Sequence, residues 1–294
     1  MKEIVVISGK GGTGKTSIVA SYAVLAKDAV LADCDVDASD LHLILSPVVG
    51  ETHGFQSGRV ALIRGQDCTR CEVCMDHCRY DAVLKTKELW KGELYTIDAI
   101  SCEGCGVCVR FCPENAIDFP ERTCGQWHVS ATRCGPMVHA RLDIGAENSG
   151  KLVTLVRSKA QQLAREQGKD LVIVDGSPGI GCPVIASITG ASLVVVVTEP
   201  TLSGVHDMKR VLELGRHFNV RSAVCVNKWD LNPEIAEDIE HEAARYDAPV
   251  IGRIHFDRSV TQAQVNGQAV VEHTDTLAAH DIRKGWEELC HMIA

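Results

Sequence analysis

Short runs of apolar residues alternate with longer amphipathic stretches along most of the chain. Runs of this kind, bounded by polar residues or glycine, are typical of parallel strands that are buried on both faces. In the stretches between them, apolar residues recur every three to four positions, which predicts helices. We therefore predict an α/β fold with a doubly wound, mostly parallel sheet. Strands are expected at 4–7, 29–34, 171–175, 193–197 and 222–226, and helices at 15–25, 38–45, 152–167, 205–217, 235–246 and 277–293.

Residues from about 58 to 120 break this alternation. Their cysteines form two groups of equal spacing, and each cysteine of the second group follows its counterpart by 34 residues. Ala82-Val83 and Ala116-Ile117 repeat at the same offset, so the segment is an internal duplication. We predict one α/β domain from residues 1–57 and 121–294, with residues 58–120 as an inserted α+β module. The cysteine groups are Cys68, Cys71, Cys74 and Cys78, and Cys102, Cys105, Cys108 and Cys112.

The segment 122–144 is predicted to form a β-hairpin that returns the chain to the α/β domain. Polar and apolar residues alternate on both sides of Gly135-Pro136, as in paired strands with one buried face. Cys124 and Cys134 lie on this hairpin without another cysteine at a metal-ligand spacing. We interpret both as structural residues.

Composition narrows the possible functions. The net charge of the 294-residue chain is −9, which argues against nucleic-acid binding driven by bulk charge. No run approaches the roughly 18 apolar residues of a membrane span, so no membrane helix is expected. The chain begins at Met1 without a charged and apolar leader, which predicts a cytoplasmic protein. In that compartment, two spaced groups among the 14 cysteines indicate metal binding rather than disulfides.

A glycine-rich segment at 8–17, Ser-Gly-Lys-Gly-Gly-Thr-Gly-Lys-Thr-Ser, lies between the first predicted strand and helix. This arrangement is that of a P-loop, in which backbone N–H groups and a helix N-terminus surround the phosphates of a nucleotide. Lys15 is expected to reach the β and γ phosphates of ATP, and Thr16 to ligate Mg²⁺. The predicted nucleotide contacts are Gly9, Lys10, Gly11, Gly12, Thr13, Gly14, Lys15, Thr16 and Ser17.

The general P-loop motif does not require a second lysine, but Lys10 follows the first glycine of this loop. Gly-Lys-Gly-Gly-Thr-Gly-Lys-Thr resembles the deviant Walker A loop of the MinD/ParA/Mrp ATPases, the class that also contains the nitrogenase iron protein. In that family the early lysine contacts phosphates bound by the facing subunit. The resemblance implies that Lys10 acts across a homodimer, or a heterodimer with a paralogue. The alternative is a lysine that is merely solvated.

The same resemblance gives roles to two aspartates at the ends of predicted strands. Asp35 matches the first-switch aspartate that senses the γ phosphate and positions the attacking water. A helix cap is the alternative, and Asp37 is expected to cap the helix 38–45. Asp175, followed by a glycine-rich second switch, matches the Walker B aspartate that holds Mg²⁺ through water. The predicted catalytic residues are Lys10, Lys15, Asp35 and Asp175.

Three further positions are singled out by the resemblance. Asn227 follows a strand at the position where the family reads adenine, and Glu199 is expected at the edge of the same pocket. Cys182 lies seven residues after Asp175, the spacing at which the nitrogenase iron protein carries a cluster ligand. The second ligand of that protein has no clear counterpart in this sequence. Cys182 is therefore either a buried or reactive thiol, or part of a metal or cluster site shared at a dimer axis.

The duplicated cysteine spacing resembles that of the bacterial two-cluster ferredoxins. Three closely spaced cysteines bind one face of a 4Fe-4S cubane, and the fourth reaches the other cluster. The pattern places a proline directly after the fourth cysteine of each group. Cys112 is followed by Pro113, as the pattern requires, but Cys78 is followed by Arg79. Zinc is the alternative metal. The expected ligand sets are Cys68, Cys71, Cys74 and Cys112 for one cluster, and Cys102, Cys105, Cys108 and Cys78 for the other.

Three functions fit these features. The leading hypothesis is a Mg²⁺-dependent ATPase whose nucleotide-dependent dimerisation gates electron or iron-sulfur transfer to a redox or iron-sulfur partner protein. The second is a spatial or division switch of the MinD/ParA type, with structural or redox-sensing clusters. The third is a cluster carrier or scaffold of the Mrp type. Two neighbouring clusters suit electron relay better than delivery, because eight thiolates hold metal tightly.

Overall fold

The computed structural model describes residues 1–88, 92–143, 146, 149–273 and 275–294. These residues fall into two compact units. The larger unit comprises 1–53, 126–141 and 148–294, and the smaller unit comprises 54–125 and 142–147. The sequence-based borders at 58 and 120 stay a prediction, as does Ile144, the expected end of the hairpin, which lies outside the described residues.

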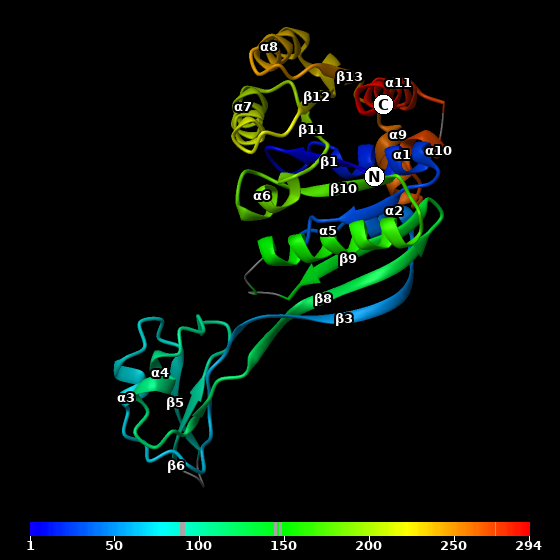
Figure 1. Ribbon diagram of the computed structural model, residues 1–294. Coiled ribbons are helices and arrows are strands. Elements are labelled where there is room, and N and C mark those ends of the chain that lie inside the picture. The colour runs from blue at the N-terminus through cyan, green and yellow to red at the C-terminus, as the bar shows by residue number, and fades with distance from the viewer. Residues whose placement is uncertain (89–91, 144–145, 147–148, 274) are drawn as a thin grey trace. The chain divides into compact units, whose positions relative to one another are not determined.

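A nine-stranded sheet forms the centre of the larger unit, in the order β13-β12-β11-β1-β10-β2-β9-β8-β3 (Figure 1). All pairs from β13 to β9 are parallel, which confirms the predicted α/β fold with a mostly parallel sheet. The strands are β1 (Lys2–Ser8), β2 (Val30–Asp33), β3 (Val48–Arg59), β8 (Glu121–Thr132), β9 (Gly135–Leu142), β10 (Leu171–Pro178), β11 (Leu193–Thr198), β12 (Ser222–Asn227) and β13 (Val250–Ile254).

Helices cover both faces of this sheet, as Figure 1 shows. On one face, α5 (Ser149–Glu166) and α6 (Cys182–Ile188) pack on β2 and β10, and α7 (Leu202–His217) and α8 (Pro233–Ala244) pack on β11 and β12. On the other face, α1 (Lys15–Ala26) contacts α2 (Leu41–Leu45), α10 (Val270–His273) and α11 (Leu277–Ile293). The short helices η1 (Trp229–Leu231) and α9 (Ser259–Val265) complete the unit.

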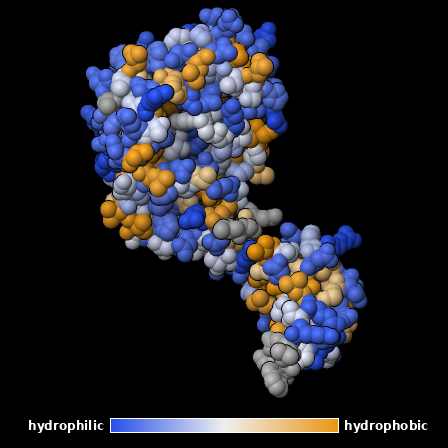
Figure 2. Space-filling view, turned by 180° about the vertical axis from the view of Figure 1, so that it is seen from behind, coloured by the Kyte–Doolittle hydropathy of each residue, from blue (hydrophilic) through white to orange (hydrophobic). Residues whose placement is uncertain are grey.

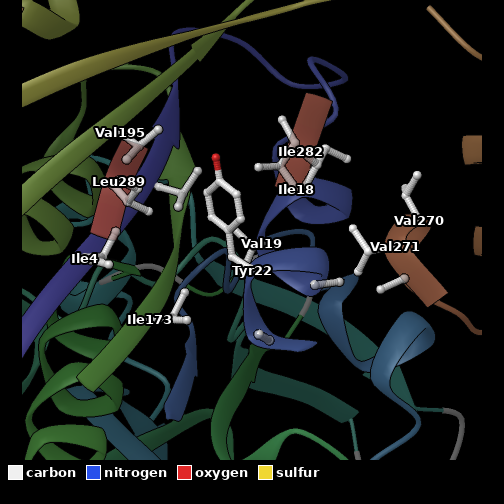
Figure 3. Packing of buried hydrophobic residues seen from close by; sticks show 14 of the residues in the cluster. Ile4, Ile18, Val19, Tyr22, Ile173, Val195, Val270, Val271, Ile282 and Leu289 are labelled. Carbon is white, nitrogen blue, oxygen red and sulfur yellow. The ribbon is translucent and has the colours of Figure 1, made fainter. Parts of the chain in front are cut away.

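The main core lies between the sheet and the α1 face (Figure 3). Tyr22 of α1 is fully buried in this core, and Figure 3 shows Ile4, Ile173 and Leu289 on one side of its ring. Its ring lies 5.2 Å from that of Trp286, measured between centroids. Because α1 is anchored on the strand that precedes the P-loop, this packing fixes where the loop begins and ends.

Two features of the segment 35–59 differ from the sequence-based expectations. The predicted helix at 38–45 begins only at Leu41, with Asp40 as its N-cap residue, so the prediction that Asp37 caps it is wrong. The short segment 35–40 is tied back by the Asp33 side chain, as described below. The strand β3 was not predicted, because its exposed residues show no apolar alternation that would indicate a strand.

The smaller unit repeats its backbone conformation as well as its cysteines. Arg70 and Glu72 have positive φ angles of 64° and 63°, and their counterparts 34 residues later, Gly104 and Gly106, have 64° and 72°. Each pair precedes a short helix, α3 or α4. His77 stacks on Phe111, its own counterpart at that offset, with ring centroids 4.6 Å apart. The elements are β4 (Leu62–Ile63), α3 (Val73–Asp76), β5 (Val83–Glu88), β6 (Gly92–Ile97), α4 (Val107–Phe111) and β7 (Ile117–Asp118).

Two antiparallel strand pairs, β4 with β7 and β5 with β6, frame the smaller unit. Figure 2 shows a gathering of apolar side chains on the surface of this unit. Among the described residues of the unit, the exposed large apolar side chains are Leu62, Tyr80, Leu84, Ile100 and Phe111.

Candidate functional site

The glycine-rich loop connects β1 to α1 at the carboxyl edge of the parallel sheet. Gly12 and Gly14 have φ angles of 80° and 84°, a region that favours glycine. A side chain at Gly14 would also collide with the amide of Asn227. The loop therefore needs glycine at this position both for its backbone conformation and for its contact with β12. Lys15 begins α1, so the unpaired N–H groups of the helix start lie at the end of the loop.

Lys15 lies in a nearly buried cluster of carboxylates. Its Nζ forms an ion pair with Oδ1 of Asp175 within β10, and lies 3.4 Å from Oδ2 of Asp35. The other oxygen of Asp175, Oδ2, is buried without a hydrogen-bond partner among the described residues. A buried carboxylate oxygen without a partner is a natural ligand for a hydrated cation. The structure thus brings together three of the predicted catalytic residues.

Asp33, at the end of β2, is a fourth member of this cluster that received no definite role from the sequence. Its side chain is fully buried, accepts a hydrogen bond from Ser39 Oγ at 2.7 Å, and accepts one from the Asp35 backbone N–H at 3.2 Å. Burial, and then the neighbouring charge of Asp175, raise the pKa of Asp33 to about 7. Burial also raises the pKa of Asp35, although Lys15 opposes this.

The charge balance of this cluster explains these shifts. Three carboxylates surround a single ammonium group, so a full set of negative charges would be poorly compensated away from water. For Lys15, burial alone would lower the pKa, but Asp175 and Asp35 outweigh it and the net direction is upward. Lys15 therefore carries its positive charge. Any bound cation would favour the ionised carboxylates.

A cavity of about 200 Å³ lies beside the loop, between the start of α1 and the ends of β12 and β13. Gly12, Gly14, Asn227 and Phe256 are among its lining residues. Asn227 also donates a hydrogen bond from Nδ2 to the Thr13 backbone oxygen at 2.7 Å. The structure thus places Asn227 at the cavity and shows a second contact, to the loop itself, that the sequence did not reveal.

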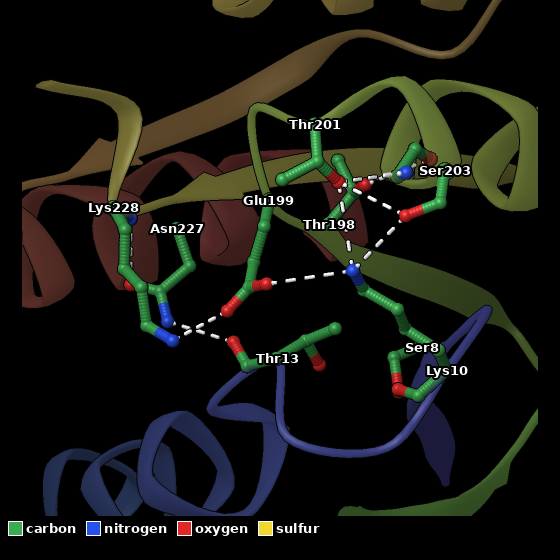
Figure 4. Close-up of polar contacts among 10 residues, drawn as sticks. Ser8, Lys10, Thr13, Thr198, Glu199, Thr201, Ser203, Asn227 and Lys228 are labelled. Atoms are coloured by element: carbon green, nitrogen blue, oxygen red, sulfur yellow. Dashed lines mark hydrogen bonds and ion pairs between the residues drawn. The ribbon is translucent and has the colours of Figure 1, made fainter. Parts of the chain in front are cut away.

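Lys10 is bound by side chains of its own chain (Figure 4). Its Nζ lies 3.7 Å from Oε2 of Glu199, and donates to the hydroxyls of Ser203 at 3.2 Å and Thr201 at 3.5 Å. Glu199 also forms an ion pair with Lys228. It was expected at the edge of an adenine pocket, whereas the structure pairs it with two lysines. No local pattern signals these contacts, because Lys10 and Glu199 are far apart in sequence.

The structure also places Thr16, Cys182 and the hairpin cysteines. Thr16 lies in the first turn of α1, next to Lys15. Cys182 is the first residue of α6, a free thiol, and exposed, so the expectation of a buried thiol is wrong. A reactive thiol and a shared metal or cluster site at this position stay predictions. Cys124 is buried and donates from Sγ to the Ser57 backbone oxygen at 3.0 Å, and Cys134 is also buried, as expected for structural residues.

In the smaller unit, the eight spaced cysteines line two separate cavities. Each cavity receives three cysteines from one group and the fourth cysteine of the other group. Apolar residues such as Ile63 and Ile117 line the first, and Val83 and Ile97 line the second. The cysteines are Cys68, Cys71, Cys74 and Cys112 in the first cavity, and Cys102, Cys105, Cys108 and Cys78 in the second.

The thiols of each set influence one another. Burial, and to a smaller extent Cys68 and Cys71, raise the pKa of the Cys74 thiol. Burial, and then Cys102, raise that of Cys108. Among the described residues, however, no three His, Cys, Asp or Glu side chains lie close enough together to hold a single metal ion.

Within the part of the chain that the structure describes, no helix is long and apolar enough to cross a membrane.

Comparison with known proteins gives a family. The chain matches the model of the CobQ/CobB/MinD/ParA nucleotide binding domain over residues 4–270. Uncharacterized protein MJ0578 of Methanocaldococcus jannaschii is 33% identical over 241 residues, which cover 78% of this chain and 79% of that protein. A second protein of that organism, MJ0579, is 23% identical, and the match covers 100% of this chain and 98% of the other.

Solved structures of the same fold include two archaeal proteins. The cell division ATPase MinD of Pyrococcus furiosus matches with a TM-score of 0.58 and 17% identity, over 99% of each chain. The septum site-determining protein MinD of Pyrococcus horikoshii, solved with Mg-ADP, matches with a TM-score of 0.57 and 16% identity, over 100% of this chain and 98% of that one. At these identities the likeness is one of fold.

Proposed function

Because the chain belongs to the CobQ/CobB/MinD/ParA nucleotide-binding family, we propose that it is a Mg²⁺-dependent ATPase that works as a nucleotide-operated switch. The observation that supports this most is the cluster of Lys15, Asp35 and Asp175 at the end of the glycine-rich loop. The cavity beside the loop, which Asn227 lines, has room for the nucleoside part of the substrate.

Each residue of the cluster has a distinct role in this proposal. Lys15 stabilises the negative charge that develops on the β and γ phosphates during hydrolysis. Thr16 would ligate Mg²⁺ and Asp175 would hold it through water, for which the unpartnered Oδ2 of Asp175 is available. Asp35 orients the attacking water. When ATP binds, Lys15 exchanges its carboxylate partners for phosphates, which frees Asp35 and Asp175 for these roles.

Dimerisation is the second part of the proposal. Lys10 stands on the exposed side of the loop, and we propose that it contacts the nucleotide bound by a facing subunit, so that ATP closes a dimer and hydrolysis reopens it. The partner is a second copy or a paralogue. Two proteins of M. jannaschii match this chain, which shows that one organism can hold two chains of this kind.

We propose that the smaller unit carries two 4Fe-4S clusters. The two cysteine sets that line separate apolar cavities correspond to the two ligand sets of a two-cluster ferredoxin. A cubane binds its four thiolates through four different iron atoms, so its ligands lie farther apart than those of a single ion. The lack of a single-ion site among the described residues is therefore compatible with clusters. When bound, the clusters supply one-electron redox chemistry.

The process that the switch serves has two candidate answers. The structural likeness to MinD proteins, which are named for cell division and septum placement, favours a spatial or division switch in which the clusters are structural or sense redox state. The two cysteine cavities favour gating of electron or iron-sulfur transfer to a partner protein, because a positioning switch does not need eight cluster thiolates. A cluster carrier of the Mrp type is the remaining variant of the second answer.

Anaerobic co-purification of the full chain with and without ATP distinguishes these answers. A partner that is itself a redox or iron-sulfur protein, and that binds only in the presence of ATP, would support gated transfer. Recovery of division or positioning proteins instead, with binding that is indifferent to the redox state of the clusters, would favour the spatial switch. Failure of the purified protein to bind or hydrolyse ATP would contradict the proposal as a whole.

A further inference from the structure

Glu199 lies where it can hold both lysines that flank the candidate phosphate site (Figure 4). It directly follows β11, and its side chain is only 15% exposed. One carboxylate oxygen pairs with Lys10 and the other with Lys228. The first two residues with hydroxyl groups on the following segment, Thr201 and Ser203, add two acceptors for the Lys10 ammonium group. Lys10 is thus surrounded by three acceptors of its own chain.

These acceptors are fixed in place. Thr201 is the N-cap residue of α7 and accepts a hydrogen bond from the Gly204 backbone N–H at 3.0 Å, so its hydroxyl cannot move away without uncapping the helix. The loop itself packs tightly on α7, because a side chain at Gly9 would collide with Asp207. The loop that carries Lys10 is thus packed against α7, whose first turn and N-cap supply the two hydroxyl acceptors.

An ammonium group held in this way has to leave its carboxylate partner before it can meet an anion on another molecule. The pair with Glu199 is partly shielded from water and so resists exchange more than an exposed pair would. A triphosphate carries more negative charge and more acceptor oxygens than one carboxylate, so it can compete with Glu199 for the Lys10 ammonium group. Glu199 therefore keeps Lys10 from contacting another molecule until a ligand with enough negative charge is present.

We propose that Glu199 is a positioning residue that retains Lys10 on its own chain and thereby sets the ATP concentration at which two nucleotide-loaded subunits pair. This inference rests on the proposed function, because it concerns the dimer that ATP closes. It adds a residue and a threshold that the family resemblance did not provide. Lys228, which lines the nucleotide cavity, is released from the same carboxylate in the same step.

The direct test compares the wild-type chain with Glu199→Gln, which keeps the size of the side chain and removes its charge. Dimer formation is followed by analytical ultracentrifugation against the concentration of a non-hydrolysable ATP analogue. Glu199→Gln is expected to dimerise at an analogue concentration at least roughly fivefold lower, as one ion pair per subunit is lost. Glu199→Asp, which keeps the charge, should restore part of the wild-type threshold.

Three controls separate a specific effect from a structural one. Glu240→Gln removes a carboxylate of α8 that pairs with Arg253 of β13 and not with Lys10, and should leave the threshold unchanged. In the Lys10→Ala background, Glu199→Gln should have no further effect on dimerisation, because its influence runs through Lys10. Added salt should narrow the difference between Glu199→Gln and the wild type, since the ion pair is screened.

A second measurement tests the retention of Lys10 without any nucleotide. Amine labelling followed by mass spectrometry should modify Lys10 several-fold faster in Glu199→Gln than in the wild type, relative to the exposed Lys284. This result can be obtained even if the chain does not bind ATP, so it separates failure of this inference from failure of the proposed function. Equal labelling, or an unchanged or higher dimerisation threshold in a variant with wild-type thermal stability, would overturn the inference. Weaker nucleotide binding by Glu199→Gln in both the wild-type and Lys10→Ala backgrounds would overturn it too, in favour of a direct nucleotide contact.

Discussion

The Ser39 hydroxyl donates a 2.7 Å hydrogen bond to the fully buried carboxylate of Asp33. This contact ties the segment between β2 and α2 to the cluster that contains Lys15 and Asp175. It also connects a partly exposed residue to a carboxylate whose pKa is raised to about 7. The protonation state of Asp33 is therefore coupled to the position of the segment that carries Asp35.

The first prediction concerns stability and pH. The pKa of Asp33 is raised to about 7, so the folded chain binds a proton that the unfolded chain has lost above pH 4. Stability from this group is present below pH 4, falls as the pH rises toward 7, and stays lost above it. Asp33→Asn should remove this loss. The variant should gain on the order of 3 kcal/mol relative to wild type between pH 4 and pH 8, measured by denaturant unfolding. Asp37→Asn, at an exposed carboxylate of the same segment, is the control and should show no such gain.

The second prediction concerns hydrolysis. Lys15→Ala should abolish ATP turnover, because it removes the charge that stabilises the β and γ phosphates. Asp35→Ala should retain binding of a fluorescent ATP analogue but slow hydrolysis by a factor of at least about 100, since the attacking water is no longer oriented. Both are measured by phosphate release at saturating ATP. Activity similar to wild type in either variant would show that the nucleotide site has been assigned wrongly.

The third prediction concerns metal content. Anaerobically purified protein should be brown and contain about eight iron and eight sulfide per chain. Cys71→Ser should reduce this to about half and leave ATP binding largely intact, because the P-loop lies in the other unit. Cys290→Ser, at a free thiol of α11 outside both cavities, is the matched control and should retain the full iron content. Stoichiometric zinc without sulfide would contradict the cluster assignment.

The fourth prediction concerns the coupling of the two activities. If ATP gates transfer, a non-hydrolysable analogue should promote dimerisation and change the EPR signal or reduction potential of at least one cluster. Lys10→Ala should bind the analogue and lose both effects. Linkage requires the converse, so reduction of the clusters should change ATP affinity by the same free energy. Identical potentials with and without the analogue, together with redox-independent ATP affinity, would argue for the spatial switch unless partner docking alone depends on ATP.

Local pattern was sufficient for much of this protein. The apolar runs predicted the parallel strands because a strand buried on both faces leaves no room for polar residues. The glycines of residues 8–17 predicted a phosphate loop because only they permit that backbone path. The 34-residue offset of the cysteines predicted a duplicated module because spacing is a property of the chain itself. The predicted helix at 38–45 begins too early, because the Asp33 side chain holds Ser39 outside the helix, a side-chain hydrogen bond that hydrophobic periodicity does not reveal.

Contacts between distant segments were decided by the tertiary structure alone. Nothing in the sequence indicates that Glu199 reaches Lys10 or that Asn227 binds the Thr13 carbonyl. Nor does it indicate that the charge of Asp175 helps to raise the pKa of Asp33. Each of these pairs is joined at the carboxyl edge of the sheet, where parallel strands from separate parts of the chain end side by side. Burial at that edge then sets the pKa values, since the cost of an unpaired charge depends on how little water remains around it. The residue types of the site follow from sequence, and their partners and charges follow from the fold.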